Sequence, residues 1–98
     1  MDGNFFKHYR KRGFGLTLEI LAELDAEAEE TQFFQKLKEK GSYLNEYYRV
    51  KKDLLKQGLI KYRLNEDYEK VIILTDKGND ILKKIMEIEE ILAQPIEK

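Results

Sequence analysis

Cationic and amide side chains suited to binding a polyanion recur along one stretch of the sequence, Ser42–Ile60. They fall on one face of a helix predicted over residues 43–57. The residues of this face are Asn45, Tyr48, Arg49, Lys52 and Lys56. Arg and Asn can form paired hydrogen bonds with base edges, and Lys can neutralise phosphates. The chemistry expected of this helix is therefore the binding of nucleic acid.

The opposite face of the same helix is apolar, and we expect it to be buried. Its residues are Tyr43, Tyr47, Val50 and Leu54. Gly58 is expected to end the helix, because glycine adopts the left-handed conformation of a helix C-terminus without steric cost. Leu59–Leu64 then has the alternation of a strand.

Charge is distributed unevenly along the chain, although the net charge is only −1. Residues 32–63 contain nine bases and three acids, which gives +6, whereas residues 23–30 contain five acids and no base. The acidic run is expected to be a solvated surface away from any polyanion. The cationic helix lies in the positive part, where further bases are expected to contact phosphates. These bases are Lys36, Lys38, Lys61 and Arg63.

Catalysis, cofactors and metal sites are not expected from these residue types. The single histidine, His8, lies in a short basic segment, Lys7–Arg12, and is predicted to be exposed. Ser42 has no motif-borne base beside it, and the chain contains neither cysteine nor a Gly-rich phosphate loop. Because no apolar run is long enough to span a bilayer, we expect a cytoplasmic protein without membrane contact.

The 98 residues are enough for one domain, whose remaining elements must position the cationic helix. Residues 1–15 are predicted to form a basic and aromatic arm, with a short helix capped by Asn4 and ended by Gly13 and Gly15. Thr17 is expected to cap a helix that runs to about residue 25–29. Thr31 would cap the next helix, which points Phe33, Phe34 and Leu37 inward and turns at Gly41.

After the cationic helix the sequence predicts a hairpin and a last helix. Val71–Thr75 is rich in β-branched residues and pairs with Leu59–Leu64 across the turn at Asn65–Asp67. Thr75 is expected to cap a helix that ends before Pro95. Its apolar stripe is wider than a lone terminal helix needs, and the central residues of the stripe are Ile81, Ile85, Ile88 and Leu92.

Two short motifs at this spacing and in this element order resemble the winged helix-turn-helix regulators of the MarR and PadR type. They are Gly58-Leu59-Ile60, directly before the hairpin, and Leu74-Thr75-Asp76-Lys77-Gly78, directly after it. The resemblance covers roughly residues 16–88. It implies a mainly α domain with a small β-hairpin, in which residues 16–75 form a three-helix core and a two-stranded wing. Residues 76–98 would form a C-terminal dimerisation helix.

The same resemblance implies a function, a sequence-specific, double-stranded DNA-binding transcriptional regulator. The third helix of such proteins lies in the major groove, and terminal helices join two copies. Asn45, Tyr48 and Arg49 would then read base edges. The homodimer interface would comprise Ile81, Ile85, Ile88 and Leu92, together with Phe5 and Phe6. The sequence leaves open whether a small effector binds.

One difference between this sequence and the family, at the tip of the wing, supports an alternative function. Wings of this type usually carry an Arg near the tip, whereas this tip contains Glu66, Asp67 and Glu69, which a phosphate backbone would repel. The alternative is a winged-helix protein-interaction module of a larger assembly, which would use the acidic tip and the terminal apolar stripe without reading DNA sequence.

Overall fold

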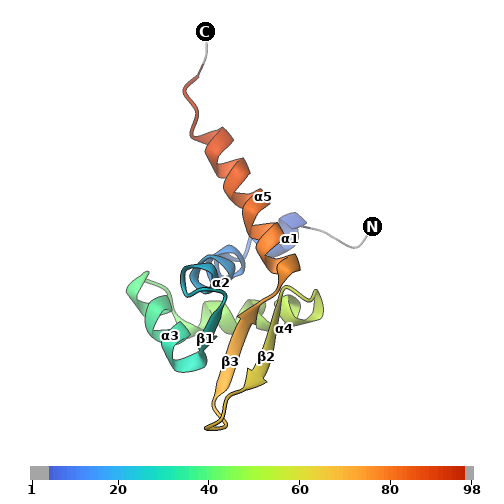
Figure 1. Ribbon diagram of the computed structural model, residues 1–98. Helices are drawn as coiled ribbons and strands as arrows, with labels where there is room; N and C mark the ends of the chain where they lie inside the picture. The colour runs from blue at the N-terminus through green and yellow to red at the C-terminus, as the bar shows by residue number, and fades with distance from the viewer. Residues whose placement is uncertain (1–4, 97–98) are drawn as a thin grey trace.

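The computed structural model describes residues 5–96 and is mainly helical with a small antiparallel sheet, as the sequence predicts. The elements in chain order are α1 (Phe5–Tyr9), α2 (Arg12–Glu23), β1 (Glu27–Glu29), α3 (Glu30–Glu39), α4 (Leu44–Lys56), β2 (Ile60–Leu64), β3 (Lys70–Leu74) and α5 (Asp76–Leu92). The hairpin β2–β3 and the free end of α5 extend in opposite directions from a helical body (Figure 1).

The core lies where α2 packs against α3, α4 and α5, with the sheet closing the remaining side. It is formed by buried side chains from every one of these elements, and those of α2, α3, α4 and the hairpin include fully buried ones. The largest are Leu18, Ile20, Leu21, Phe33, Leu37, Tyr47, Leu54, Ile60 and Ile72. Because α2 has partners on several sides, its position decides how α4 and α5 are presented.

The sheet has three strands in the order β1-β3-β2, one strand more than the sequence predicts. The extra strand, β1, pairs antiparallel with β3, and Ala28 lies opposite Ile72. It falls in the acidic run that was expected to continue a helix. Asp25 and Ala26 leave the helix with φ of 61° and 69°, and the carbonyl oxygen of Ala26 accepts a hydrogen bond from the Leu74 amide at 2.8 Å. That prediction was therefore wrong, because an alanine here adopts a conformation in which glycine is expected.

The start of α2 also differs from the prediction. The helix begins at Arg12 and runs through Gly13 and Gly15, which were expected to break it. Thr17, the predicted cap, is fully buried in the middle of the helix, and its hydroxyl has no hydrogen-bond partner among the described residues. A Cβ at Gly13 would overlap the carbonyl oxygen of Glu46 in α4. Packing against α4 therefore outweighs the low helix propensity of glycine.

The predicted caps of the other helices have different outcomes. Thr31 does not cap α3, which begins at Glu30, and Asn4 lies outside the described residues. Thr75 does cap α5, since its hydroxyl accepts a hydrogen bond from the Gly78 amide at 3.0 Å. No helix within residues 5–96 is long and apolar enough to cross a membrane.

The cationic helix is observed close to its predicted bounds, as α4. Tyr47, Val50 and Leu54 are buried as expected, and Gly58 follows the helix with φ of 73°. Tyr43 was predicted to share this buried face, which is wrong. It precedes the first helical residue with an extended backbone, and its side chain is 73% exposed. Helix periodicity does not apply to a residue outside the helix.

The close approach of α2 and α4 can be tested by a matched pair of substitutions, one at Gly13 and one at Gly15. Gly13→Ala should destabilise the protein by about 1–3 kcal/mol, because the new methyl group must push apart two backbones. Gly15→Ala should instead gain up to about 1 kcal/mol of helix propensity, since the nearest atom, Cε2 of Tyr9, lies 3.4 Å from the added Cβ. Urea unfolding measures both free energies. Equal effects of the two substitutions would contradict the packing described for Gly13.

Candidate nucleic-acid interface

The five side chains that the sequence assigns to the cationic face of α4 all lie exposed on one side of this helix. Arg49, Lys52 and Lys56 lie one or two helical turns apart, with Asn45 and Tyr48 on the same side near the start of the helix. Tyr48 keeps 51% of its surface exposed. The face therefore presents three cations, an amide and a phenol without an acid among them.

One flank of this face adjoins the hairpin through a pair of tyrosines. Tyr47, fully buried in α4, and Tyr62, half-buried in β2, form a hydrogen bond between their hydroxyl groups. Burial is the main cause that raises the pKa of Tyr47, and the hydrogen bond with Tyr62 adds to the effect. The Tyr47 hydroxyl thus stays neutral, and this contact fixes the hairpin beside α4.

Two further lysines, Lys51 and Lys70, extend the positive charge along that flank. The Lys51 ammonium group lies 5.7 Å from the ring centre of Tyr48 and 5.3 Å from that of Tyr62. The ammonium group of Lys70 in β3 lies 4.8 Å from the ring centre of Tyr62. Such cation–π contacts hold lysines in place while leaving their charge available. Helix periodicity alone did not single out Lys51, because its position lies between the buried and exposed faces.

The opposite flank of α4 contains its two acids, and both are paired with the N-terminal segment. Glu46 accepts a hydrogen bond from the Ser42 hydroxyl at 2.8 Å and lies 3.5 Å from the Arg12 guanidinium. Asp53 lies 3.6 Å from Lys11 and also 3.6 Å from His8. His8 was predicted to be exposed, but it is half-buried, because its ring stacks on Phe14. These pairs keep the carboxylates off the outer face.

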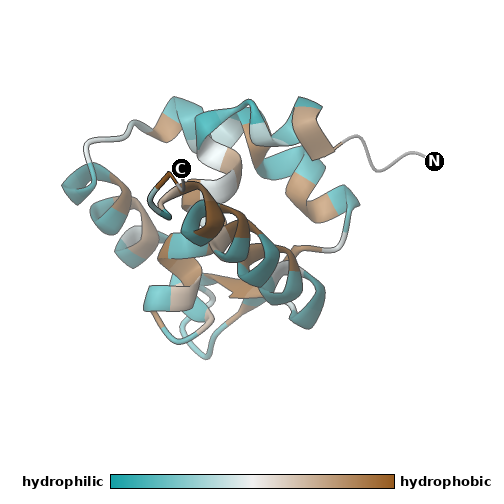
Figure 2. Ribbon diagram, turned by 90° about the horizontal axis from the view of Figure 1, so that it is seen from above, coloured by the Kyte–Doolittle hydropathy of each residue, from teal (hydrophilic) through white to brown (hydrophobic). Residues whose placement is uncertain are grey.

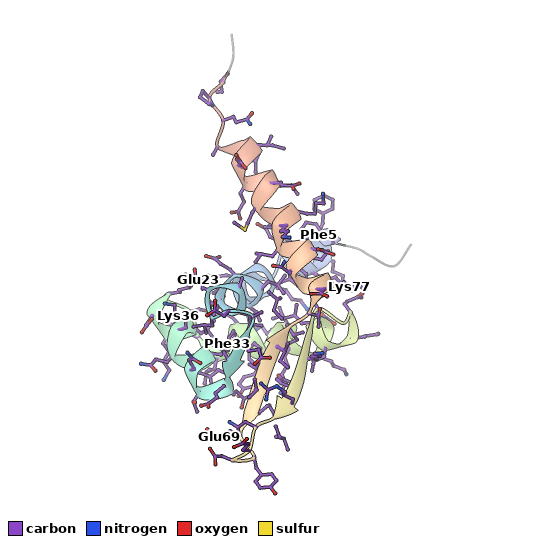
Figure 3. All side chains as sticks on the ribbon, viewed as in Figure 1. Phe5, Glu23, Phe33, Lys36, Glu69 and Lys77 are labelled. Carbon is purple, nitrogen blue, oxygen red and sulfur yellow. The ribbon has the colours of Figure 1, made fainter. Side chains whose placement is uncertain are left out.

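The two lysines of α3 do not act together. Lys36 and Lys38 are two residues apart, so they point to different sides of the helix. Lys36 forms an ion pair with Glu39 at 3.7 Å and lies at the outer edge of α3 (Figure 3). Phe34 contacts Tyr48 with ring centres 6.2 Å apart, and Lys38 lies one turn after Phe34. Lys38 is therefore the α3 lysine placed toward the face of α4.

The two bases of β2 lie on the other face of the sheet. Since neighbouring side chains of a strand alternate, Lys61 and Arg63 point away from α4 while Tyr62 points toward it. The guanidinium of Arg63 forms an ion pair with Glu27 of β1 at 2.7 Å. The structure thus separates Lys61 and Arg63 from the other predicted DNA-contacting residues.

The tip of the hairpin is an ordered acidic turn. The Asn65 side chain accepts hydrogen bonds from the amides of Asp67 and Glu69, both at 2.9 Å. Tyr68 adopts φ of 60°, and its side chain is 84% exposed. Glu69 marks this end of the molecule in Figure 3, far from the α1 and α5 region. The tip therefore presents three carboxylates and one phenol at the far end of the hairpin.

The residues predicted for the dimer interface divide into two sets. Ile85 is buried within the chain itself, and Ile81 and Phe5 are half-buried against the same core. Ile88, Leu92 and Phe6 are exposed, at 49%, 79% and 78%. The apolar stripe of α5 thus begins in the core and continues beyond the body of the chain into solvent.

No group of three or more His, Asp or Glu side chains within residues 5–96 is arranged to hold a metal ion. In comparisons with known proteins, no family model, no characterised protein and no solved structure matched the chain.

A double-mutant cycle tests the hydrogen bond between Tyr47 and Tyr62, which joins α4 to the hairpin. Tyr62→Phe should cost about 1–3 kcal/mol, because the buried Tyr47 hydroxyl loses its partner. Tyr47→Phe should cost less, since the half-exposed Tyr62 hydroxyl can bond to water. The double variant should be more stable than the sum of the two effects implies. Urea unfolding of the four proteins measures the coupling, and additive effects would show that the hydroxyls do not interact.

Proposed function

We propose that this protein is a cytoplasmic transcriptional regulator that binds double-stranded DNA sequence-specifically as a homodimer, with α4 in the major groove. The observation that carries the proposal is the exposed face of α4. This face presents Asn45, Tyr48, Arg49, Lys52 and Lys56 together, and its flanks add Lys51 and Lys70 on one side and Arg12 on the other. A helix of this diameter fits the major groove, and these residue types suit base edges and phosphates.

The arrangement of the elements is compatible with a winged helix-turn-helix. α3 and α4 are joined by a short turn that contains Gly41, with φ of 76°, and the hairpin β2–β3 lies beside α4 as a wing would. The element order and the two motifs around the hairpin support the same assignment. In this reading Asn45 and Arg49 contact base edges, while the lysines contact phosphates on either side of the groove.

Two copies are expected to join through the free half of α5. From Met86 to Ile96 every residue is exposed, including five large apolar side chains. They are Met86, Ile88, Ile91, Leu92 and Ile96. Apolar segments continue to the free end of the helix (Figure 2), and an isolated helix of this length is marginal in water. A second copy that covers this stripe would place two α4 helices on one DNA molecule.

A homodimer joined through this stripe is expected to have twofold symmetry, as most homodimers have. The two groove helices should then be spaced about 34 Å apart, which predicts a near-palindromic site.

The double substitution Arg49→Ala with Lys52→Ala tests the groove helix. Both side chains are exposed, so the fold should be unaffected, and duplex binding should weaken by about 2–5 kcal/mol in total. Fluorescence anisotropy with duplexes selected from a random pool measures the loss. The control, Lys83→Ala with Lys84→Ala on α5, removes the same charge at a distance. If both double variants bind DNA as the unmodified protein does, α4 is not the DNA-contacting helix.

The dimer prediction is tested at residues that do not contribute to the chain's own core. Ile88→Glu with Leu92→Glu should give a folded monomer in analytical ultracentrifugation, because four like charges would face one another across the proposed interface. Ile85 is unsuitable, since charging a buried side chain would unfold the domain. Circular dichroism checks the fold. A variant that stays dimeric would place the interface elsewhere, with Phe6 as the next candidate.

The acidic tip favours one second candidate function, a protein-interaction module. Glu66, Asp67, Glu69 and the exposed ring of Tyr68 project together on an ordered turn, which is a poor ligand for DNA and a suitable one for a basic protein surface. Glu66→Gln with Glu69→Gln separates the two functions. It should leave DNA binding unchanged or slightly stronger if the first proposal is correct. If the protein acts as an interaction module, this variant should lose activity in vivo while Arg49→Ala with Lys52→Ala keeps it.

A further inference from the structure

A basic cleft opens between the junction of α1 with α2 and the side of α4. Its volume is about 450 Å³, and the charged side chains that line it are Lys7, Arg10, Lys11, Arg12, Arg49 and Glu46. Five of these six groups are cationic. The residues come from three elements, so the cleft exists only because α1 folds back beside α4.

Aromatic packing holds the N-terminal segment in that position. Phe5 stacks on Tyr9, with ring centres 5.1 Å apart, and meets Phe14 edge-on at 6.3 Å. His8 stacks on Phe14 from the next turn at 5.9 Å. The Tyr9 hydroxyl donates a hydrogen bond to Glu89 of α5 at 3.2 Å. The apolar side of α1 is thus anchored, and Lys7 and Arg10 remain for the cleft.

The acids around the cleft do not balance its charge. Glu46, the one acid in the lining, already pairs with Arg12 and Ser42, and Lys11 pairs with Asp53. Lys7, Arg10 and Arg49 form no ion pair with any acid among residues 5–96. Cations gathered along one cleft produce a positive potential that attracts an anion.

We infer that this cleft binds backbone phosphates of the DNA strand that borders the groove occupied by α4. Arg49 carries the inference, because it belongs both to the outer face of α4 and to the lining of the cleft. Successive phosphates of one strand are spaced about 3.4 Å along the duplex axis. A strand that passes Arg49 would therefore carry its neighbouring phosphates toward Lys7 and Arg10. The inference rests on the proposed function and extends its footprint to the N-terminal arm.

An anionic membrane is the less suitable partner for the same charges. A surface-bound helix needs a broad exposed apolar face beside its basic one, whereas α1 has only five residues and buries much of Phe5. Phe6 is its one large apolar side chain with most of its surface exposed, at 78%.

The test compares Lys7→Ala with Arg10→Ala against two controls, with a selected duplex of about 30 base pairs as the probe. One control, Lys83→Ala with Lys84→Ala, removes the same charge from α5. The other, Lys7→Arg with Arg10→Lys, keeps the charge of the cleft. Anisotropy is measured between about 50 and 200 mM salt. The cleft variant should bind about 10- to 100-fold more weakly at the lower salt, and its log–log salt slope should be smaller by about 1–2.

Each outcome decides one point. The inference is supported if the cleft variant alone binds DNA more weakly and with a smaller salt slope, while its preference among DNA sequences is unchanged. Equal losses in the α5 control would show a general charge effect and overturn it, as would a cleft variant that binds like the unmodified protein. Binding to phosphatidylserine vesicles that disappears in the cleft variant would assign the cleft to membranes instead. An unmodified protein that binds no duplex would overturn the proposed function itself.

Discussion

The burial of one face of α4 is the constraint on which the rest of the molecule depends. Tyr47, Val50 and Leu54 are buried among α2, α3 and the hairpin, and the missing side chain at Gly13 lets α2 approach the α4 backbone closely. Once that face is fixed, the cations have no position except the outside of the helix. The contact also sets the path of the chain before it, because α1 folds back where α2 begins and closes the basic cleft beside Arg49.

The positive charge of the outer face of α4 depends on where the fold places the acidic side chains. A net charge of −1 would not suggest a polyanion ligand, but both acids of α4 itself are paired. Glu46 and Asp53 face the N-terminal bases, Glu27 pairs with Arg63 behind the sheet, and Lys40 bridges Glu19 and Glu23 at the edge of α2. The hydrogen bond with Glu23 raises the pKa of Lys40, so this bridge remains charged. The outer face of α4 is left positive within a chain that is nearly neutral.

The sequence predicted the parts of the fold that depend on local patterns. The bounds of α4, the left-handed Gly58, the hairpin and the Thr75 cap all have signatures within a few residues, and the exposed face of α4 follows from its periodicity. Three features had no such signature. β1 starts after a left-handed alanine rather than a glycine, the start of α2 depends on packing at Gly13, and the separation of Lys61 and Arg63 from the site depends on which face of the sheet meets α4. The cleft was equally inaccessible, because only the fold brings Lys7 and Arg10 near Arg49.

An NMR titration of the isotope-labelled protein with duplex DNA tests whether nucleic acid binds to the outer face of α4. We expect the amide chemical shifts of α4 from Asn45 to Lys56 to change, and the changes to weaken as salt is raised. The signals of the acidic tip at Glu66–Glu69 should stay unchanged. Shift changes confined to the tip or to the exposed half of α5, with α4 unaffected, would contradict binding at this face.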